Sequence, residues 1–306
     1  MSDSNIGARK HKQVKDHLFI LHGIINSVIH GKESCIDIHI YDLEQAFDAL
    51  WLDDCMSDLF DSLSKENRDE KIAWLYKLNE RNLVSINTPH GLTKRRNIEK
   101  IVQQGGTWGP LLCSNSVDSI GRELWINNEM VYLYKNSVRI LPLGMVDDIT
   151  AISECGVKSL ELNTYINSKI ELKKLRFHTP DSSGRTKCHK IHIGRHQVHC
   201  PVLKVHGSEM KEVSEDEYLG DIVNKDGNNK SNIIKRTSRG IGLVSEIVII
   251  LDQVTFGHHY FETATLLRKA LFLSSMLNNV EVKYNLSKAE LQEFDDVDLQ
   301  LLKKII

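Results

Sequence analysis

Two adjacent aspartates interrupt an apolar stretch of the chain. Asp147 and Asp148 lie in the segment LGMVDDIT (residues 143–150), whose leucine, methionine, valine and isoleucine favour burial. Two carboxylates close together in a low-dielectric site repel each other, so they must be protonated, face water or share a cation. The pair is therefore a candidate divalent metal site. The alternative is a solvated pair, as we expect for Asp53–Asp54 and Asp295–Asp296 on helix faces.

A third carboxylate ends a segment of alternating isoleucines. In CIDIHIYD (residues 35–42) this period-two pattern predicts a half-buried strand, and Asp42 falls on its isoleucine face. If neighbouring strands of one sheet bring Asp42 to Asp147 and Asp148, three carboxylates converge. Such a cluster favours hard divalent cations such as Mg²⁺, and a pair of ions can activate a hydroxyl and stabilise the leaving oxygen of a phosphoryl transfer.

The surrounding pattern predicts the elements that position these acids. A basic loop at 5–15 leads into a helix with an apolar stripe from Leu18 to Ile29, and a strand–turn–strand unit over 131–153 places Gly144 to Asp147 in its turn. The other predicted elements are helices at 46–63, 68–80 and 154–174, a hairpin within 83–102, a hairpin formed by 189–194 and 201–207, and helical structure from about 230 onward.

Composition limits the class of protein. The chain has 306 residues, 41% hydrophobic, which suits one large or two smaller domains. Six cysteines without a CxxC pair, no apolar run long enough to span a bilayer and no signal peptide predict an intracellular protein, nuclear or cytoplasmic. A net charge of −2 counts mildly against nucleic acid, so any such partner must be held by local basic patches.

Five blocks in a fixed order carry a family resemblance. They are YDLEQAFDALW (41–51), QQGGTWGPLL (103–112), MVDD (145–148), KCHKIHIG (187–194) and YLGDIV (218–223). The chain resembles the reverse transcriptases of non-LTR (LINE-type) retrotransposons over nearly its whole length. That family has an aspartate followed five residues later by an aromatic, then QG-x3-[S/G]-P, then a hydrophobic pair before two aspartates. Alanine is commoner there at the position of Val146.

The resemblance implies a fold and a reaction. We expect an α+β protein with a polymerase palm built on an antiparallel sheet with packed helices, partial fingers at about 1–35 and 58–93, and a helical thumb-like C-terminal region. Fingers remnant and palm would occupy 1–226 and the thumb 227–306, with the polar segment 224–232 as boundary. The reaction would be RNA-directed DNA synthesis, with an RNA template, a DNA primer and dNTPs as partners and no membrane.

The resemblance also implies roles for single residues. Asp42, Asp147 and Asp148 would be the catalytic acids and, with the carbonyl of Leu43, the ligands of two Mg²⁺ ions, with Mn²⁺ as a substitute. The residues expected to bind the nucleotide are Phe47, Gln104, Gly105 and Lys187, of which Phe47 would exclude a 2′-hydroxyl and Lys187 would donate a proton to pyrophosphate. The residues expected to contact template or primer are Arg9, Lys10, Tyr218, Leu219 and Gly220.

Each of these roles has a simpler alternative. Phe47, Tyr218 and Leu219 can be ordinary core residues, Gln104 a loop cap, Arg9 and Lys10 a solvated charge run, and Lys187 an exposed lysine before a strand. A separate constellation, Cys188, His192, His196 and Cys200, repeats every fourth residue and can be a zinc site or a histidine-rich hairpin.

Relative to the family, we expect the chain to be truncated at its N-terminus, with an incomplete nucleotide pocket and no endonuclease. Phosphoryl transfer depends mainly on positioning, so such a truncation can remove most of the rate. A catalytically inactive fragment that binds nucleic acid or protein is therefore the leading alternative function. A palm polymerase that makes RNA is the second.

Overall fold

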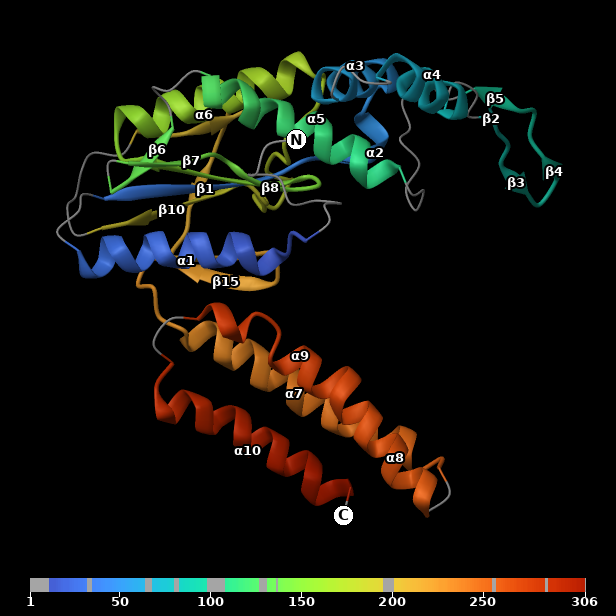
Figure 1. Ribbon diagram of the computed structural model, residues 1–306, viewed down its shortest axis with the longest axis vertical. Coiled ribbons are helices and arrows are strands. Elements are labelled where there is room, and N and C mark those ends of the chain that lie inside the picture. Colours follow the sequence, from blue (N-terminus) through green and yellow to red (C-terminus); the bar gives the residue numbers. More distant parts are fainter. Residues whose placement is uncertain are drawn as a thin grey trace. The chain divides into compact units, whose positions relative to one another are not determined.

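The chain forms two compact units in the computed structural model (Figure 1), which describes residues 11–31, 35–63, 68–79, 83–97, 108–126, 131–135, 137–194, 201–254, 257–283 and 286–305. One unit comprises Met1–Val14 and Lys32–Ser214, and the other Lys15–Gly31 and Glu215–Ile306. The units thus divide after residue 214, whereas the sequence placed its boundary after 226, and a segment expected in the fingers belongs to the second unit.

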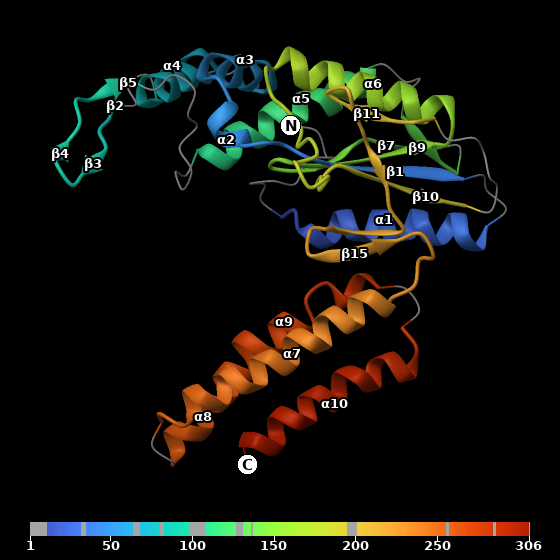
Figure 2. The same ribbon diagram turned by 180° about the vertical axis from the view of Figure 1, so that it is seen from behind.

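The first unit is built on a five-stranded sheet with the strand order β13-β10-β1-β9-β8 (Figures 1 and 2). All neighbours pair antiparallel except β10 and β13, which are parallel. The α+β class is therefore confirmed, with one parallel pair at the edge of the sheet. The strands are β1 (Ile36–Asp42), β8 (Leu143–Met145), β9 (Asp148–Glu154), β10 (His189–Ile193) and β13 (Lys211–Glu212).

Helices cover the sheet face that carries Tyr41. The apolar core of the unit lies there, and Tyr41 stacks on Phe177 at 4.8 Å between ring centroids. Figure 1 shows α5 and α6 on this same side of the sheet. The helices of the unit are α2 (Ala46–Ala49), α3 (Leu52–Ser62), α4 (Arg68–Asn79), α5 (Gly109–Ile126) and α6 (Val157–Leu172).

Strand β1 is buried on both faces, so the expectation of a half-buried strand is wrong. Asp37 and His39, the polar residues of the alternation, are as buried as the isoleucines. Their polar atoms find partners inside the fold: His39 Nε2 lies 2.9 Å from Ser159 Oγ on α6, and Asp37 Oδ1 lies 2.8 Å from His192 Nδ1 on β10. Buried polar groups are tolerated when they are hydrogen-bonded, which period-two patterning cannot reveal.

One of the two predicted hairpins is confirmed and the other is wrong. Within 83–97, β2 (Leu83–Val84) pairs with β5 (Arg96–Asn97), and β3 (Asn87–Thr88) pairs with β4 (Gly91–Leu92). In contrast, 189–194 and 201–207 do not pair: β10 pairs with β1 and β13, while β11 (Lys204–Val205) pairs with β12 (Ser208–Glu209). A further hairpin joins β6 (Tyr132–Tyr134) to β7 (Val138–Ile140).

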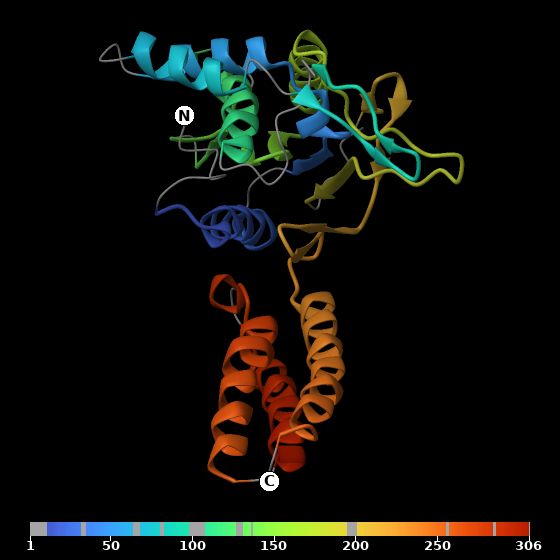
Figure 3. The ribbon, with the colours of Figure 1, turned by 90° about the vertical axis from the view of Figure 1, so that its right-hand side faces the viewer.

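The second unit combines a long helix, a hairpin and a helical bundle. Its helices enclose an apolar core around Phe272, Met276 and Leu301, and α7 runs beside α10 (Figure 3). The elements are α1 (Val14–His30), β14 (Glu215–Tyr218), β15 (Asp221–Asn224), α7 (Lys230–Leu251), α8 (His258–Leu267), η2 (Arg268–Leu273), α9 (Ser274–Met276), η3 (Val280–Val282) and α10 (Lys288–Ile305). Both the apolar-striped helix and the helical C-terminal region are confirmed.

A buried carboxylate joins three elements of this second unit and the segment that follows η3. Asp221 of β15 is fully buried, with His22 Nε2 of α1 at 2.6 Å, Arg236 of α7 at 3.3 Å and Lys283 in hydrogen-bond contact. Burial alone would raise the pKa of Asp221, but the hydrogen bond from His22 and the charge of Lys283 outweigh it and lower that pKa. The cluster therefore fixes α1 to the hairpin. Among the described residues, no helix is both long and apolar enough to cross a membrane.

Candidate active site

Strand pairing brings the three acids of the sequence pattern together. The antiparallel pairing of β1 with β9 ends with Asp42 directly opposite Asp148. Opposed residues of an antiparallel pair point to the same face of the sheet, with their Cβ atoms about 4.5–5.5 Å apart. Asp147 precedes Asp148 in the connection from β8 to β9. The convergence on which the metal-site hypothesis depends is thus present.

The turn that carries Asp147 has an unusual backbone. Met145 pairs with Asp148, so Val146 and Asp147 form a two-residue hairpin loop, shorter than the turn expected from Gly144 to Asp147. Val146 has a φ of 62°, which is a strained conformation for a β-branched residue. Its side chain packs against the core cluster, and its carbonyl accepts a hydrogen bond from the Cys113 thiol. Surrounding contacts thus maintain a strained turn beside the acids.

The acids influence each other electrostatically. Burial raises the pKa of Asp148 to about 6, and the charges of Asp147 and Asp42 add to this effect. Burial also raises the pKa of Asp147, with a further contribution from Asp42. Clustered, partly desolvated carboxylates of this kind favour a cation, and their oxygen donors fit the hard ligands that Mg²⁺ prefers. The donor set therefore fits the implied ions.

Lys187 lies within this cluster. Its Nζ is 3.2 Å from Asp42 Oδ2, and its side chain is 64% exposed. The positive charge opposes the rise in the pKa of both Asp147 and Asp148. The sequence placed Lys187 near the nucleotide, but it did not indicate an ion pair with Asp42. That contact depends on the pairing of β10 with β1, which brings residues far apart in the chain together.

Leu43 continues β1 beyond Asp42 through a bridge to Phe177. The two hydrogen bonds of the bridge run from Glu44 N to Arg176 O and from His178 N to the carbonyl of Asp42. Neither uses the backbone groups of Leu43, and antiparallel geometry directs those groups away from the 176–178 segment. The Leu43 carbonyl is therefore left available by this bridge, as a metal-ligand role requires.

Phe47 lies in α2, directly after the turn that follows β1. The helix begins at Ala46 after Gln45, whose φ is 47°. The ring is partly buried and packs against the core cluster of the first unit. Phe47 thus combines a core contact with partial exposure, which is compatible both with a sugar-contacting role and with the ordinary core role.

The remaining expected site residues belong to the second unit or lie outside the described residues. Tyr218 is buried and its hydroxyl lies 3.2 Å from His17 Nδ1, while Leu219 and Gly220, with φ of 50° and 80°, form the loop between β14 and β15. The expected turn is present, in the second unit. Gln104, Gly105, Arg9 and Lys10 lie outside the described residues.

Cys188 and His192, the two described residues of the zinc site suggested by sequence spacing, do not lie close enough to share a metal ion. Cys188 Sγ lies 3.7 Å from the Asp42 carbonyl, close to the acids, whereas His192 pairs with Asp37 toward the opposite end of β1. Four residues along a strand span about 13 Å, too far for one metal ion. His196 and Cys200 lie outside the described residues. His192 instead meets two other cysteines, Cys35 and Cys155.

No protein-family model and no curated protein matches the sequence. Among solved structures, apo telomerase from Candida tropicalis aligns with a TM-score of 0.52 and 13% identity, over 99% of this chain and 47% of that chain. Telomerase from Candida albicans, in complex with a TWJ fragment of telomeric RNA, aligns with a TM-score of 0.45 and 12% identity, over 99% and 48%. The chain thus spans less than half of either protein. The similarity to the apo enzyme shows a shared fold.

Proposed function

We propose that this chain is the reverse-transcriptase region of a non-LTR retrotransposon, which adds deoxynucleotides to a DNA 3′-hydroxyl on an RNA template. The observation that carries the proposal is the pairing of Asp42 with Asp148 beside the Asp147 turn. The shared fold supports it, because telomerase is a reverse-transcriptase-related polymerase. The five ordered sequence blocks add the retrotransposon assignment.

The acids would bind the metal ions at this site, and Lys187 would donate a proton. Asp42 and Asp147 would hold two Mg²⁺ ions, with Asp148 and the Leu43 carbonyl completing the oxygen donors. When bound, such ions activate the attacking hydroxyl and stabilise the leaving oxygen. The Lys187 side chain is exposed, and its ion pair with Asp42 is 3.2 Å long. Because solvent surrounds the side chain, its ammonium group can turn from Asp42 to the leaving pyrophosphate and donate a proton.

Primer extension tests the proposal directly. The purified chain is given a DNA primer annealed to an RNA template, with dNTPs and Mg²⁺. Asp147→Asn should lower the extension rate by about 100-fold or more, because metal-assisted charge stabilisation contributes several kcal/mol to the barrier. Asp53→Asn, an equal charge change on an exposed helix position, should leave the rate unchanged.

A chain that binds primer–template but adds no nucleotide, with no difference between the wild type and Asp147→Asn, would contradict the enzymatic proposal. The result would favour the alternative of a non-catalytic module that binds nucleic acid. Binding of the primer–template duplex is measured in the same samples, so that a loss of extension activity can be distinguished from a loss of duplex binding.

Phe47 tests the choice of sugar. Replacement by the smaller valine should lower discrimination against ribonucleotides by about tenfold or more, since removing the ring removes steric exclusion of the 2′-hydroxyl. Incorporation of each dNTP is compared with that of its rNTP. Phe19→Val, an exposed position on α1, is the matched control. Unchanged selectivity in Phe47→Val would assign Phe47 to the core alone, and a wild type that prefers rNTPs would indicate an RNA-making polymerase.

A further inference from the structure

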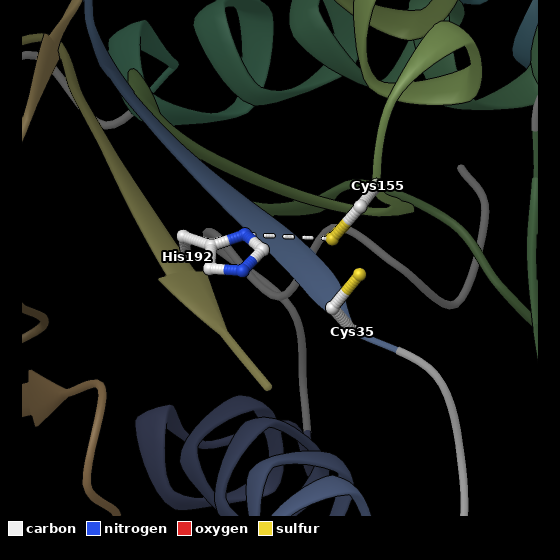
Figure 4. Close-up of side chains that lie close together, drawn as sticks. All are labelled: Cys35, Cys155 and His192. Atoms are coloured by element: carbon white, nitrogen blue, oxygen red, sulfur yellow. Dashed lines mark hydrogen bonds between the residues drawn. The ribbon is translucent and has the colours of Figure 1, made fainter. Parts of the chain in front are cut away.

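Two cysteines and a histidine meet at the end of the sheet opposite the acids. Cys35 directly precedes β1, Cys155 directly follows β9, and His192 lies in β10 (Figure 4). Because β10, β1 and β9 are neighbours in the sheet, these three residues meet at the same end of the strands. The acids lie at the other end of the same strands, about 17 Å away along β1 from Asp37 to Asp42.

The distances fit a tetrahedral metal ion. One ligand atom from each of Cys35, Cys155 and His192 lies within 4.8 Å of the other two. Cys155 Sγ is 3.5 Å from His192 Nδ1. Zinc bond lengths and a tetrahedral angle give a sulfur–nitrogen separation of about 3.6 Å. The observed separation therefore leaves room for one zinc ion between these ligands.

A buried carboxylate lies beside the cluster and contacts its histidine. Asp37 Oδ1 lies 2.8 Å from His192 Nδ1 and 3.6 Å from Cys155 Sγ. Asp37 is fully buried, so its negative charge is stabilised only by neighbours inside the protein. Two thiols and an imidazole, beside a buried carboxylate, form a donor set that suits zinc better than Mg²⁺ or Ca²⁺, which prefer oxygen alone.

The backbone closes tightly around one of the cysteines. A Cβ atom added to Gly194 would lie 2.5 Å from Cys35 Cβ, so only glycine permits this approach, and Gly194 also has a φ of 146°. Cys35 itself is 2% exposed. Gly194 therefore fixes the position of Cys35 within the cluster.

We propose that Cys35, Cys155 and His192 bind one Zn²⁺ beside the buried carboxylate of Asp37, and that the ion joins the ends of β9, β1 and β10. The ion neutralises the thiolates and the buried carboxylate and fixes three central strands at the end remote from the acids. The site is independent of polymerase activity, since none of its ligands belongs to the acidic cluster. It also differs from the constellation suggested by sequence spacing, with which it shares only His192.

Metal content and cobalt spectroscopy of the full chain test this proposal. The wild type, purified from zinc-supplemented medium, should contain one zinc per chain by elemental analysis. After removal of zinc, Co²⁺ should give a thiolate-to-cobalt charge-transfer band and the intense visible bands of tetrahedral cobalt. Oxygen ligands such as the acids give no thiolate band, so the spectrum distinguishes the two sites.

Substitution of single cysteines shows which residues bind the metal ion. Cys155→Ser, at the less buried cysteine, should weaken Co²⁺ binding by more than about 100-fold, since even residues that only support metal ligands contribute about 10–100-fold. Cys55→Ala, which removes a buried thiol outside the cluster, should retain full binding. A folded wild type without zinc or a thiolate band would overturn the proposal. A mass spectrum showing Cys35 and Cys155 joined as a disulfide in the wild type would overturn it too.

Discussion

The carboxyl of Asp148 lies between two other carboxyls, and burial together with their charges raises its pKa to about 6. In the unfolded chain its pKa is 3.8. The folded state therefore binds the proton more tightly than the unfolded state, and the free energy of unfolding falls as pH rises from 3.8 to about 6. The full penalty is present at neutral pH when no cation is bound. Without a bound cation, the clustered acids that would catalyse the reaction therefore lower the free energy of unfolding of the protein.

Asp148→Asn should consequently stabilise the metal-free protein. At pH 7 with a chelator, the free energy of unfolding should rise by about 1–3 kcal/mol, a range discounted for partial solvent access. At about pH 4 the gain should disappear, because the wild-type carboxyl is then protonated in the folded state. Urea denaturation at both pH values measures the difference, with Asp53→Asn as the exposed control. Equal or lower stability of the variant at pH 7 would contradict the electrostatic account.

At the scale of residues, part of the site could be predicted from sequence. The period-two pattern placed Asp42 at the end of a strand and Asp147 and Asp148 at a strand–turn–strand unit, and their convergence was expected from the family resemblance and on the condition that these strands are neighbours. The ion pair of Lys187 and the meeting of Cys35 with Cys155 could not be predicted, because both depend on which strands become neighbours. Local spacing carries no information about those long-range pairings.

At the scale of elements, a buried polar network joins β1 to α6. His39 bonds to Ser159 at 2.9 Å and to Tyr41 at 3.0 Å, and the Tyr41 hydroxyl donates to Asn163 at 2.9 Å. Burial lowers the pKa of His39 to about 4. Neutral His39 therefore favours the fold above its unfolded pKa of 6.5, and this contribution is lost as pH falls from 6.5 toward 4.

His39→Gln should reduce the acid sensitivity of the first unit. The wild type should lose roughly 3 kcal/mol through His39 between pH 7 and about pH 4, and the variant should lack this loss. At pH 7 the variant should be less stable by about 1–2 kcal/mol, because hydrogen bonds to buried partners are weakened. His90→Gln, at an exposed position, provides the control. If the variant and wild type lost stability in parallel on acidification, His39 would not be the responsible group.

The expected boundary differs from the division into units, and the expected hairpin is wrong, for physical reasons at this scale. The polar segment 224–232 runs from the end of β15 through a turn into α7 inside the second unit, where Asn224 Nδ2 donates to the Asn228 carbonyl at 2.8 Å. Polar turn residues and interdomain linkers have similar composition, so sequence alone does not separate them. The 189–194 segment was a correct strand with an incorrect partner, since β1 offered a longer antiparallel pairing.

At the scale of the whole molecule, the second unit is discontinuous in sequence. Helix α1 packs against the hairpin of β14 and β15 within this unit, although His17 and Tyr218, whose side chains meet, are 201 positions apart in the sequence. His22 contacts Asp221, and a Cβ atom added to Gly227 would lie 2.5 Å from Ile29 Cδ1. The C-terminal segment therefore lacks part of its core without the N-terminal helix.

A fragment spanning 215–306 should accordingly be only partly folded alone and should bind a peptide spanning 15–31. Addition of the peptide should increase helicity and raise the melting temperature of the fragment, because a ligand that binds only the folded state stabilises it. Circular dichroism and calorimetry measure both effects. A His22→Ala peptide should bind more weakly, and an Ile20→Ala peptide, altered at an exposed position, should bind like the wild type. A fragment that is fully folded without the peptide would contradict this prediction.

The pairing of β1 with β9 runs without interruption from Ile36 opposite Glu154 to Asp42 opposite Asp148. Side chains alternate faces at every residue of a strand, so one inserted or deleted residue between these ends would invert everything beyond it. Asp42 would then take the sheet face that carries Tyr41, and either Tyr41, after an insertion, or Leu43, after a deletion, would lie opposite Asp148. Length changes in this protein are therefore expected at the 88–91 hairpin tip, and not within β1.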